Sequence, residues 1–231
     1  MKLQKSITSK LFYGKWPYKI QTVCPGSYMI KRQGVGKTLA FCYDTYQDPW
    51  NKHINKERLL QFLNDVELFV DRKDIQVRTE GSNFDIFCAD KNLFNQLCTK
   101  LRHWIREIWE PANDVEYDFI VNNSAKKVLC NHIPFNQYPY KVYIKYNMPR
   151  NTRTAFKTWV TNYEGKIKTA TATHIWLNGR DAYNALIIYV ADQPTLSMVG
   201  MFLGNSILRV EEFIPRSRIN ISLDQEETCP H

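Results

Sequence analysis

Residues 16–20, Trp-Pro-Tyr-Lys-Ile, recur in altered form at residues 138–142 as Tyr-Pro-Tyr-Lys-Val. Each copy opens a stretch of aromatic and β-branched residues, which is typical of a β-strand. A second match joins Phe84–Asp90 to Leu186–Asp192, since both stretches are largely apolar and end in Ala-Asp before a helical pattern, where each aspartate is predicted to cap the helix. The recurrence therefore indicates an internal duplication, in which corresponding elements of two halves carry similar sequences.

The first half shows patterns in the order strand, helix, strand, strand, helix, strand. Its strands are predicted at 17–23, 74–79, 84–88 and 117–121. One helix begins after Asn55 with an apolar stripe from Leu59 to Val70, and the other begins after Asp90 with a stripe from Leu93 to Ile108. Residues 24–55 form an insertion, in which 27–33 and 38–43 are predicted to pair as a hairpin.

The second half repeats this order of elements. Its strands are predicted at 140–146, 166–177, 185–191 and 206–213, and its helices at 152–163 and 195–203. Two such patterns predict an α+β fold of two ferredoxin-like (split βαβ) halves, each an antiparallel sheet with helices on one face. The first half covers 1–122, the second covers 123–215, and 216–231 are predicted to be a mobile tail.

The net charge of the chain is +8 at pH 7, and the basic excess lies mainly in the second half. Residues 119–223 contain 13 Lys and Arg against 5 Asp and Glu. An excess of this sign favours a polyanionic partner, and a merely solvated surface accounts for it equally well. The charge balance therefore makes nucleic acid a candidate partner but does not distinguish it from a solvated basic surface.

Several classes of protein and site lack their signals in this sequence. No apolar run is long enough to span a membrane and no signal peptide is evident, so we expect a cytoplasmic protein, in a cell or an infected host, with no membrane association. The six cysteines are scattered without a Cys-x-x-Cys pair, so we expect reduced thiols. The five histidines show no metal-binding spacing, and we predict neither a metal nor a cofactor.

Residues 34–38, Gly-Val-Gly-Lys-Thr, end like a phosphate-binding P-loop. That motif needs a glycine five positions before Gly36, where this chain has Lys31, and a helix after the loop, where the pattern predicts a strand. We therefore interpret the segment as a hairpin turn that presents Lys31, Arg32 and Lys37 to solvent, where they are candidate contacts for nucleic acid.

The predicted strand at 166–177 places Lys166, Lys168, His174 and Trp176 on one face. If the other face of this strand packs on the helices, these four residues line the open side of the sheet. An aromatic ring beside cations on an open sheet is a common way to hold single-stranded nucleic acid. The alternative is a partly covered face, packed against the other half, with the basic residues at its rim.

These observations support three hypotheses of function. The first is a non-enzymatic protein that binds RNA or single-stranded DNA through this basic, aromatic sheet face. The second is a viral or phage structural protein that assembles through sheet edges and termini, so that its partner is a protein and its location the virion. The third is a metal-independent ribonuclease with His174 as the base, similar in architecture to CRISPR repeat-processing endonucleases, whose glycine-rich C-terminal loop is not evident here. Because no complete catalytic signature is present, we assign no catalytic residue.

Overall fold

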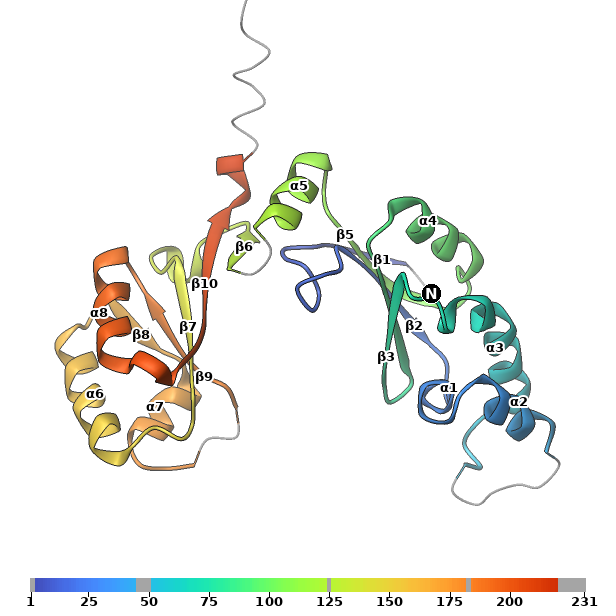
Figure 1. Ribbon diagram of the computed structural model, residues 1–231, viewed down its shortest axis with the longest axis horizontal. Helices are drawn as coiled ribbons and strands as arrows, with labels where there is room; N and C mark the ends of the chain where they lie inside the picture. The colour runs from blue at the N-terminus through green and yellow to red at the C-terminus, as the bar shows by residue number, and fades with distance from the viewer. Residues whose placement is uncertain (1–2, 45–50, 124–125, 182–183, 220–231) are drawn as a thin grey trace, which may run out of the picture. The chain divides into compact units, whose positions relative to one another are not determined.

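The computed structural model describes residues 3–44, 51–123, 126–181 and 184–219 (Figure 1). The chain divides into two compact units, Met1–Val121 and Asn122–His231. Each unit contains one five-stranded sheet with its own helices and its own hydrophobic core. None of the described helices is long and apolar enough to cross a membrane.

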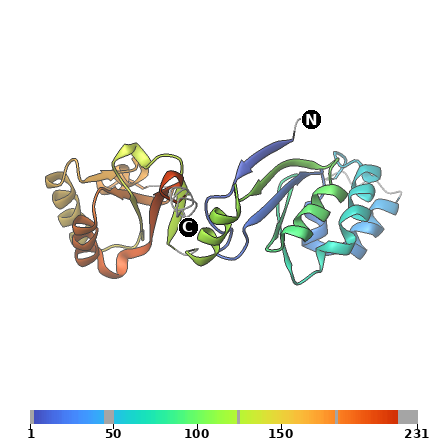
Figure 2. The same cartoon turned by 90° about the horizontal axis from the view of Figure 1, so that it is seen from above.

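The sheet of the first unit has the strand order β1-β5-β2-β4-β3. Its strands are β1 (Gln4–Ile7), β2 (Tyr18–Val23), β3 (Ile75–Glu80), β4 (Asn83–Cys88) and β5 (Ile105–Glu110). Neighbours are antiparallel except for β1 and β5, which are parallel. The helices are α1 (Tyr28–Gln33), α2 (Val35–Tyr43), α3 (Lys56–Val70), α4 (Lys91–Lys100) and α5 (Asp114–Asn122), and α1 to α4 gather on one side of the sheet (Figures 1 and 2).

The sheet of the second unit has the order β6-β10-β7-β9-β8. Its strands are β6 (Lys127–Cys130), β7 (Tyr140–Ile144), β8 (Ile167–Thr169), β9 (Leu186–Val190) and β10 (Ile207–Pro215). Here too only the first-listed pair, β6 and β10, is parallel. The helices are α6 (Arg150–Asn162), α7 (Thr171–Leu177) and α8 (Gln193–Leu203).

The two sheets have the same order and the same strand directions, so the prediction of an α+β chain with two similar halves is confirmed. In each unit the four strands β5-β2-β4-β3, or β10-β7-β9-β8, follow an order compatible with the ferredoxin-like arrangement. A fifth strand, β1 or β6, extends each sheet by parallel pairing and was not predicted. Its pairing runs over only four residues, too few to give a clear periodic signal.

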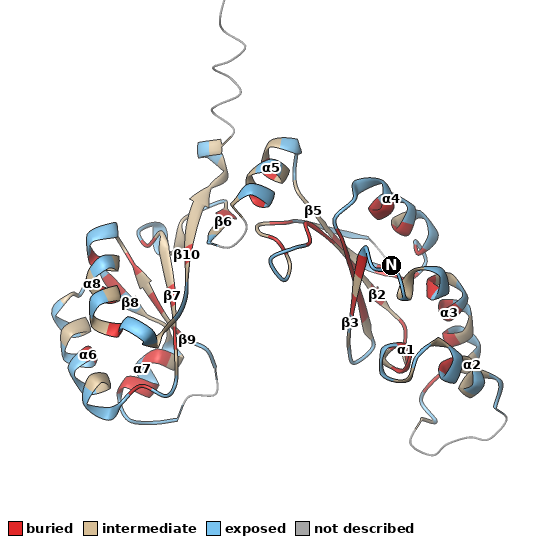
Figure 3. Cartoon of the chain, in the orientation of Figure 1, coloured by how far each residue is buried: buried red, intermediate tan, exposed pale blue. Residues whose placement is uncertain are grey.

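One face of each sheet is buried under helices. In the first unit Ile20 and Ile86 pack with Phe62, Leu63 and Leu97 from α3 and α4. In the second unit Val142 and Ile188 pack with Phe156, Val199 and Leu203 from α6 and α8. The buried residues therefore alternate along the central strands with residues that face away from the helices (Figure 3).

The predicted hairpin at 27–33 and 38–43 is wrong, because both segments are helical. Gly34, whose φ is +83°, ends α1 and allows the chain to turn directly into α2. Val35, Leu39 and Cys42 recur at helical spacing and pack against the first core, which stabilises a helix over a strand. The insertion at 24–55 is thus a pair of helices followed by a loop that lies partly outside the described residues.

The predicted helix through Ile108 and the predicted strand at 117–121 are also wrong. Helix α4 ends at Lys100, and 105–110 form β5, which is hydrogen-bonded to β1 and β2. A register shift in the β2–β5 pairing lets Ile105 and Ile108, three residues apart, both face the core and imitate a helical stripe. Residues 117–121 lie in α5, whose first turn is capped by Asn113 through a 2.8 Å bond from Glu116 N–H.

The predicted strand at 166–177 is mostly helical. Only 167–169 pair, as β8, and α7 follows at once. The alternating threonines suggested a strand, but the Thr173 hydroxyl donates to Ile187 O (2.7 Å) and accepts from Ile187 N–H (2.6 Å). These two bonds let a buried helix replace further sheet pairing beside β9. In the predicted tail, residues 216–219 are helical and 220–231 lie outside the described residues.

All three predicted helix caps are present. The side chains of Asn55, Asp90 and Asp192 accept hydrogen bonds from the backbone N–H of Arg58, Leu93 and Thr195, at 2.8, 2.6 and 2.8 Å. Asp90 and Asp192 begin the corresponding helices of the two units. Local side-chain chemistry therefore fixes the same helix start in both.

Replacing Asp192 tests the contribution of this cap. Thr195, through its side chain and backbone N–H, holds the pKa of Asp192 below its ordinary value of 3.8, and Lys166 adds to the effect. The charged form therefore stabilises the folded state above that value, and the stabilisation is lost as the pH falls through the lowered folded-state pKa. We expect Asp192→Ala to lower the free energy of unfolding by about 1 kcal/mol at neutral pH, measured by urea denaturation.

Asp192→Asn is the matched control, because asparagine still caps a helix but does not titrate. It should lose less stability than Asp192→Ala and show a flatter decline of stability below about pH 4. Equal stability of wild type and Asp192→Ala would contradict the role of the cap.

Candidate nucleic-acid interface

The four residues predicted to share a strand face do not share one. Trp176 lies in α7 with 4% of its surface exposed, inside the second core, and the Arg153 guanidinium carbon lies 5.2 Å from its ring. His174 is exposed on the same helix, with Nε2 3.2 Å from Asn178 Nδ2. The prediction is wrong for these two residues because they belong to a helix.

The two lysines lie at the edge strand β8. Lys166, just before it, pairs with Asp192 at 3.2 Å, so its charge is matched by a carboxylate. Lys168 is on the side of the sheet that faces away from the helices, opposite the buried Ile167. Of the four predicted residues, Lys168 alone contributes a cation to the open face.

The three cations predicted around Gly34 are exposed, as expected, but on a helical corner. Lys31 and Arg32 are in the last turn of α1, and Lys37 is in the first turn of α2. No ion pair joins any of them to an acidic residue within the described part of the chain. They form a small basic surface on the first unit.

The open face of the second sheet carries aromatic and basic side chains that the sequence analysis did not assign. On β7, Lys141 and Tyr143 alternate with the buried Val142 and Ile144. The strand register pairs Lys141 with Tyr189 of β9 and Tyr143 with Arg209 of β10, so all four lie on one face. Lys168 pairs with Tyr189 from the other side and belongs to the same face.

Cations and rings are in direct contact on this face. The Arg209 guanidinium carbon lies 3.9 Å from the Tyr143 ring centroid, and Lys141 Nζ lies 4.8 Å from the same centroid. Lys168 Nζ lies 3.9 Å from the ring of Phe135, which packs edge-on against Tyr189 with centroids 5.2 Å apart. We refer to these six residues as the basic aromatic face: Phe135, Lys141, Tyr143, Lys168, Tyr189 and Arg209.

The charge of the face is positive. Its three cations stand against the carboxylate of Glu211, which is buried, accepts a 3.1 Å hydrogen bond from the Tyr143 hydroxyl and lies 3.5 Å from Arg209. Glu211 therefore fixes the positions of Tyr143 and Arg209 from below the surface. The resulting face combines ring surfaces with two lysines, Lys141 and Lys168, that have no ion pair within the described residues.

Phe135 reaches the face through an unusual backbone conformation. Its φ is +54°, in the left-handed region that costs a non-glycine residue energy, and its side chain is 56% exposed. Tyr13, 122 positions earlier, has φ +53° and packs edge-on against Phe87, the counterpart of Tyr189, with centroids 5.1 Å apart. Each unit thus holds an exposed aromatic residue, with the same left-handed backbone, over its corresponding strand, β4 or β9.

The chain matches no protein-family model, no curated protein and no solved structure. A functional assignment must therefore come from the site itself.

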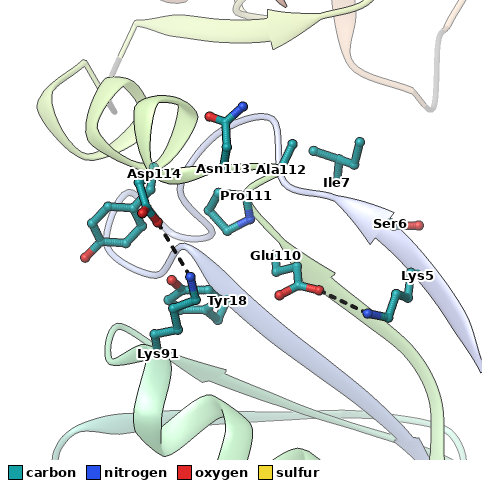
Figure 4. Close-up of a pocket in the computed structure, with 11 residues that line it drawn as sticks. Lys5, Ser6, Ile7, Tyr18, Lys91, Glu110, Pro111, Ala112, Asn113 and Asp114 are labelled. Carbon is teal, nitrogen blue, oxygen red and sulfur yellow. Dashed lines mark ion pairs between the residues drawn. The ribbon is translucent and has the colours of Figure 1, made fainter.

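A cavity of about 370 Å³ in the first unit is another candidate site (Figure 4). Its four charged groups form two pairs, Lys5 with Glu110 at 3.6 Å and Lys91 with Asp114 at 3.5 Å. Burial, with help from Tyr117, Glu110 and Asp114, raises the pKa of Tyr18 to about 12, so its phenol stays protonated at neutral pH. Tyr18 is therefore not a general base near neutrality.

Metal and thiol chemistry find no support either. The described residues contain no group of three His, Cys, Asp or Glu side chains that could hold a metal ion. The five described cysteines are free, and burial raises the pKa of Cys24 to about 11 and of Cys88 to about 12. Thiols with such values are poor nucleophiles at neutral pH.

Removing Trp176 distinguishes its core position from the predicted surface position. We expect Trp176→Ala to lower the free energy of unfolding by about 3–5 kcal/mol, because it leaves a large cavity beside Phe156 and Ile188. His174→Ala, on the exposed side of the same helix, should change it by no more than about 0.5 kcal/mol. Chemical denaturation of both variants checks this, and a stable Trp176→Ala protein would restore the surface assignment.

Proposed function

We propose that this protein binds single-stranded RNA or DNA, without catalysis, through the basic aromatic face of the second unit. The observation that carries the proposal is the contact of Lys141, Lys168 and Arg209 with aromatic rings on the side of the sheet opposite its helices. Rings accept stacked bases whatever the sequence, and the cations beside them neutralise the phosphates that follow.

The side chains on this face are able to change partners on binding. Lysine and arginine have long flexible stems, so their charged ends can turn from a ring to a phosphate while the stems remain in place. A base that stacks on Phe135 or Tyr143 then replaces the cation on the ring surface. The exchange retains a favourable contact for both groups, which lowers the net cost of opening the face.

The basic corner of the first unit supports the same class of ligand. Lys31, Arg32 and Lys37 project from α1 and α2 without an acidic partner in the described segments. Scattered cations of this kind contact phosphates and add affinity without reading sequence. We therefore propose that the corner contributes to the salt dependence of binding and that stacking is confined to the rings.

A second candidate function is assembly through a sheet edge. The outer strand β1 has an unpaired edge among the described residues, and Leu3 and Ile7, at its two ends, are exposed. Such an edge can accept a strand from another chain. The ribonuclease hypothesis has less support, because no contact joins His174 to a second acid–base group in the described residues.

Fluorescence anisotropy with a labelled single-stranded oligonucleotide tests the nucleic-acid proposal. We expect binding at low ionic strength that weakens steeply with salt, and weaker binding to a duplex of the same length. Phe135→Ala and Tyr143→Ala should each cost about 1–3 kcal/mol of binding free energy. Lys168→Ala/Arg209→Ala should lower the slope of log K against log salt by about 1.4.

The matched control is Arg150→Ala/Lys157→Ala, which removes one arginine and one lysine from α6 on the other side of the sheet. It should leave stacking and the salt slope nearly unchanged. The proposal fails if the wild type shows no salt-sensitive binding, or if the two double variants bind alike.

Light scattering after size-exclusion chromatography tests the assembly candidate. If the β1 edge joins neighbouring copies, the protein without nucleic acid should form a defined oligomer, and Ile7→Lys should dissociate it because a charge opposes edge pairing. If the wild-type protein is a monomer and Ile7→Lys does not change its mass, the assembly candidate is rejected and the nucleic-acid proposal remains.

A further inference from the structure

The corresponding face of the first unit is partly roofed by residues 7–13. Residues 7–13 lie along the sheet, and between them and strands β2, β3, β4 and β5 is a cavity of about 430 Å³ that is partly open to solvent. Its volume is within the range of pockets that hold small ligands. The floor is formed by Lys19, Asp85, Phe87 and Trp109, which face away from the helices.

Aromatic rings line this cavity on more than one side. Phe12, from the roof, lies 5.5 Å from Phe87 and 6.4 Å from Trp109, measured between ring centroids. Trp109 also receives Lys19, whose Nζ lies 4.2 Å from the centroid of the indole ring. Walls of this kind suit a flat, polarisable ligand that can stack.

An ion pair lies at the floor of the cavity, largely removed from water. Lys19 Nζ is 3.0 Å from Asp85 Oδ2, and the two side chains are only 14% and 8% exposed. Gln21 Nε2 donates a 3.0 Å hydrogen bond to the other carboxylate oxygen. Desolvation of two charges costs free energy, so a buried pair is weak support for stability and calls for another explanation.

The second unit indicates that the fold does not require this pair. Lys141 occupies the place of Lys19, since each pairs with the aromatic residue of the third strand, Tyr189 or Phe87. The place of Asp85, opposite Gln21, is taken by Ile187, opposite Tyr143. The same sheet therefore forms with isoleucine at this position.

We propose that the cavity of the first unit binds a nucleobase. Asp85 Oδ2 faces Lys19 Nζ and Oδ1 accepts from Gln21, and each oxygen has a second acceptor position. The Lys19 ammonium has two donors besides the one that it directs at Asp85. The pair can therefore offer a donor and an acceptor side by side to the edge of a base. Trp109 would stack on one face of the base, and Phe12, whose ring is turned 79° from that of Trp109, would contact another edge. Nucleobases are the flat ligands whose edges present adjacent donors and acceptors.

The base can belong to a free nucleotide or to a nucleic-acid strand. This site lies in the other unit from the basic aromatic face and is made of different residues, so it stands or fails independently of the proposed function. If the base belongs to a strand, an oligonucleotide displaces a bound mononucleotide. If it belongs to a free nucleotide, the oligonucleotide and the mononucleotide bind together.

Isothermal titration calorimetry of the full chain with AMP, GMP, CMP and UMP tests the site, with ribose 5-phosphate as the ligand that lacks a base. At least one nucleotide should bind with a Kd of about 1 mM or below, and ribose 5-phosphate should not. Asp85→Ile, which copies the second unit, and Trp109→Leu should each weaken binding at least about tenfold. Arg150→Ala/Lys157→Ala, on α6 of the other unit, should leave it unchanged.

Thermal unfolding identifies a variant that fails to fold, and Phe12→Ala then takes its place, because Phe12 belongs to the partly exposed roof. The proposal is overturned if none of the four nucleotides binds saturably, or if ribose 5-phosphate binds equally well. It is also overturned if the folded variants of the cavity bind like the wild type, or if Arg150→Ala/Lys157→Ala removes binding. Adding an unlabelled single-stranded oligonucleotide to the nucleotide complex then distinguishes the two sources of the base.

Discussion

The central strand of each sheet, β2 in one unit and β7 in the other, is hydrogen-bonded on both sides. Its side chains must alternate between the helix-covered face and the opposite face, and no slip of register is possible without burying charge. Ile20 and Val142 therefore enter the cores, and Lys19 and Lys141 point the other way. Both proposed binding sites are built outward from these two lysines.

What differs between the units is the covering of that opposite face. In the first unit residues 7–13 partly cover it, and a carboxylate at position 85 pairs with Lys19 at the floor of the cavity. In the second unit Phe135 contacts Tyr138, Tyr189 and Lys168, and Lys141 rests on a tyrosine instead of a carboxylate. One scaffold thus yields a partly covered cavity with an ion pair at its floor, and an outer face whose two lysines, Lys141 and Lys168, have no ion pair within the described residues.

Much of the fold was predictable because local signals agreed with tertiary structure. Asn55, Asp90 and Asp192 were assigned as caps from side-chain chemistry, and each one accepts the expected backbone hydrogen bond. Long-range contacts decided the failures: pairing on both sides made 105–110 a strand, and Thr173 bonding to Ile187 replaced a strand with α7. No window of neighbouring residues contains those partners.

In the candidate site, too, the features set by neighbouring residues were predictable and those set by long-range contacts were not. The alternation of Lys141 and Tyr143 with buried residues was visible in the sequence, whereas their approach to Arg209 depends on a strand more than 60 positions later. Phe135 was the hardest to foresee, because its place on the face requires a left-handed backbone that aromatic residues rarely adopt. Tyr13 adopts the same backbone at the matching position, so the strained geometry recurs in two different surroundings. Because this backbone conformation recurs at corresponding positions, it belongs to the fold that the two units share. In that fold an aromatic side chain is held against the outer face of the sheet.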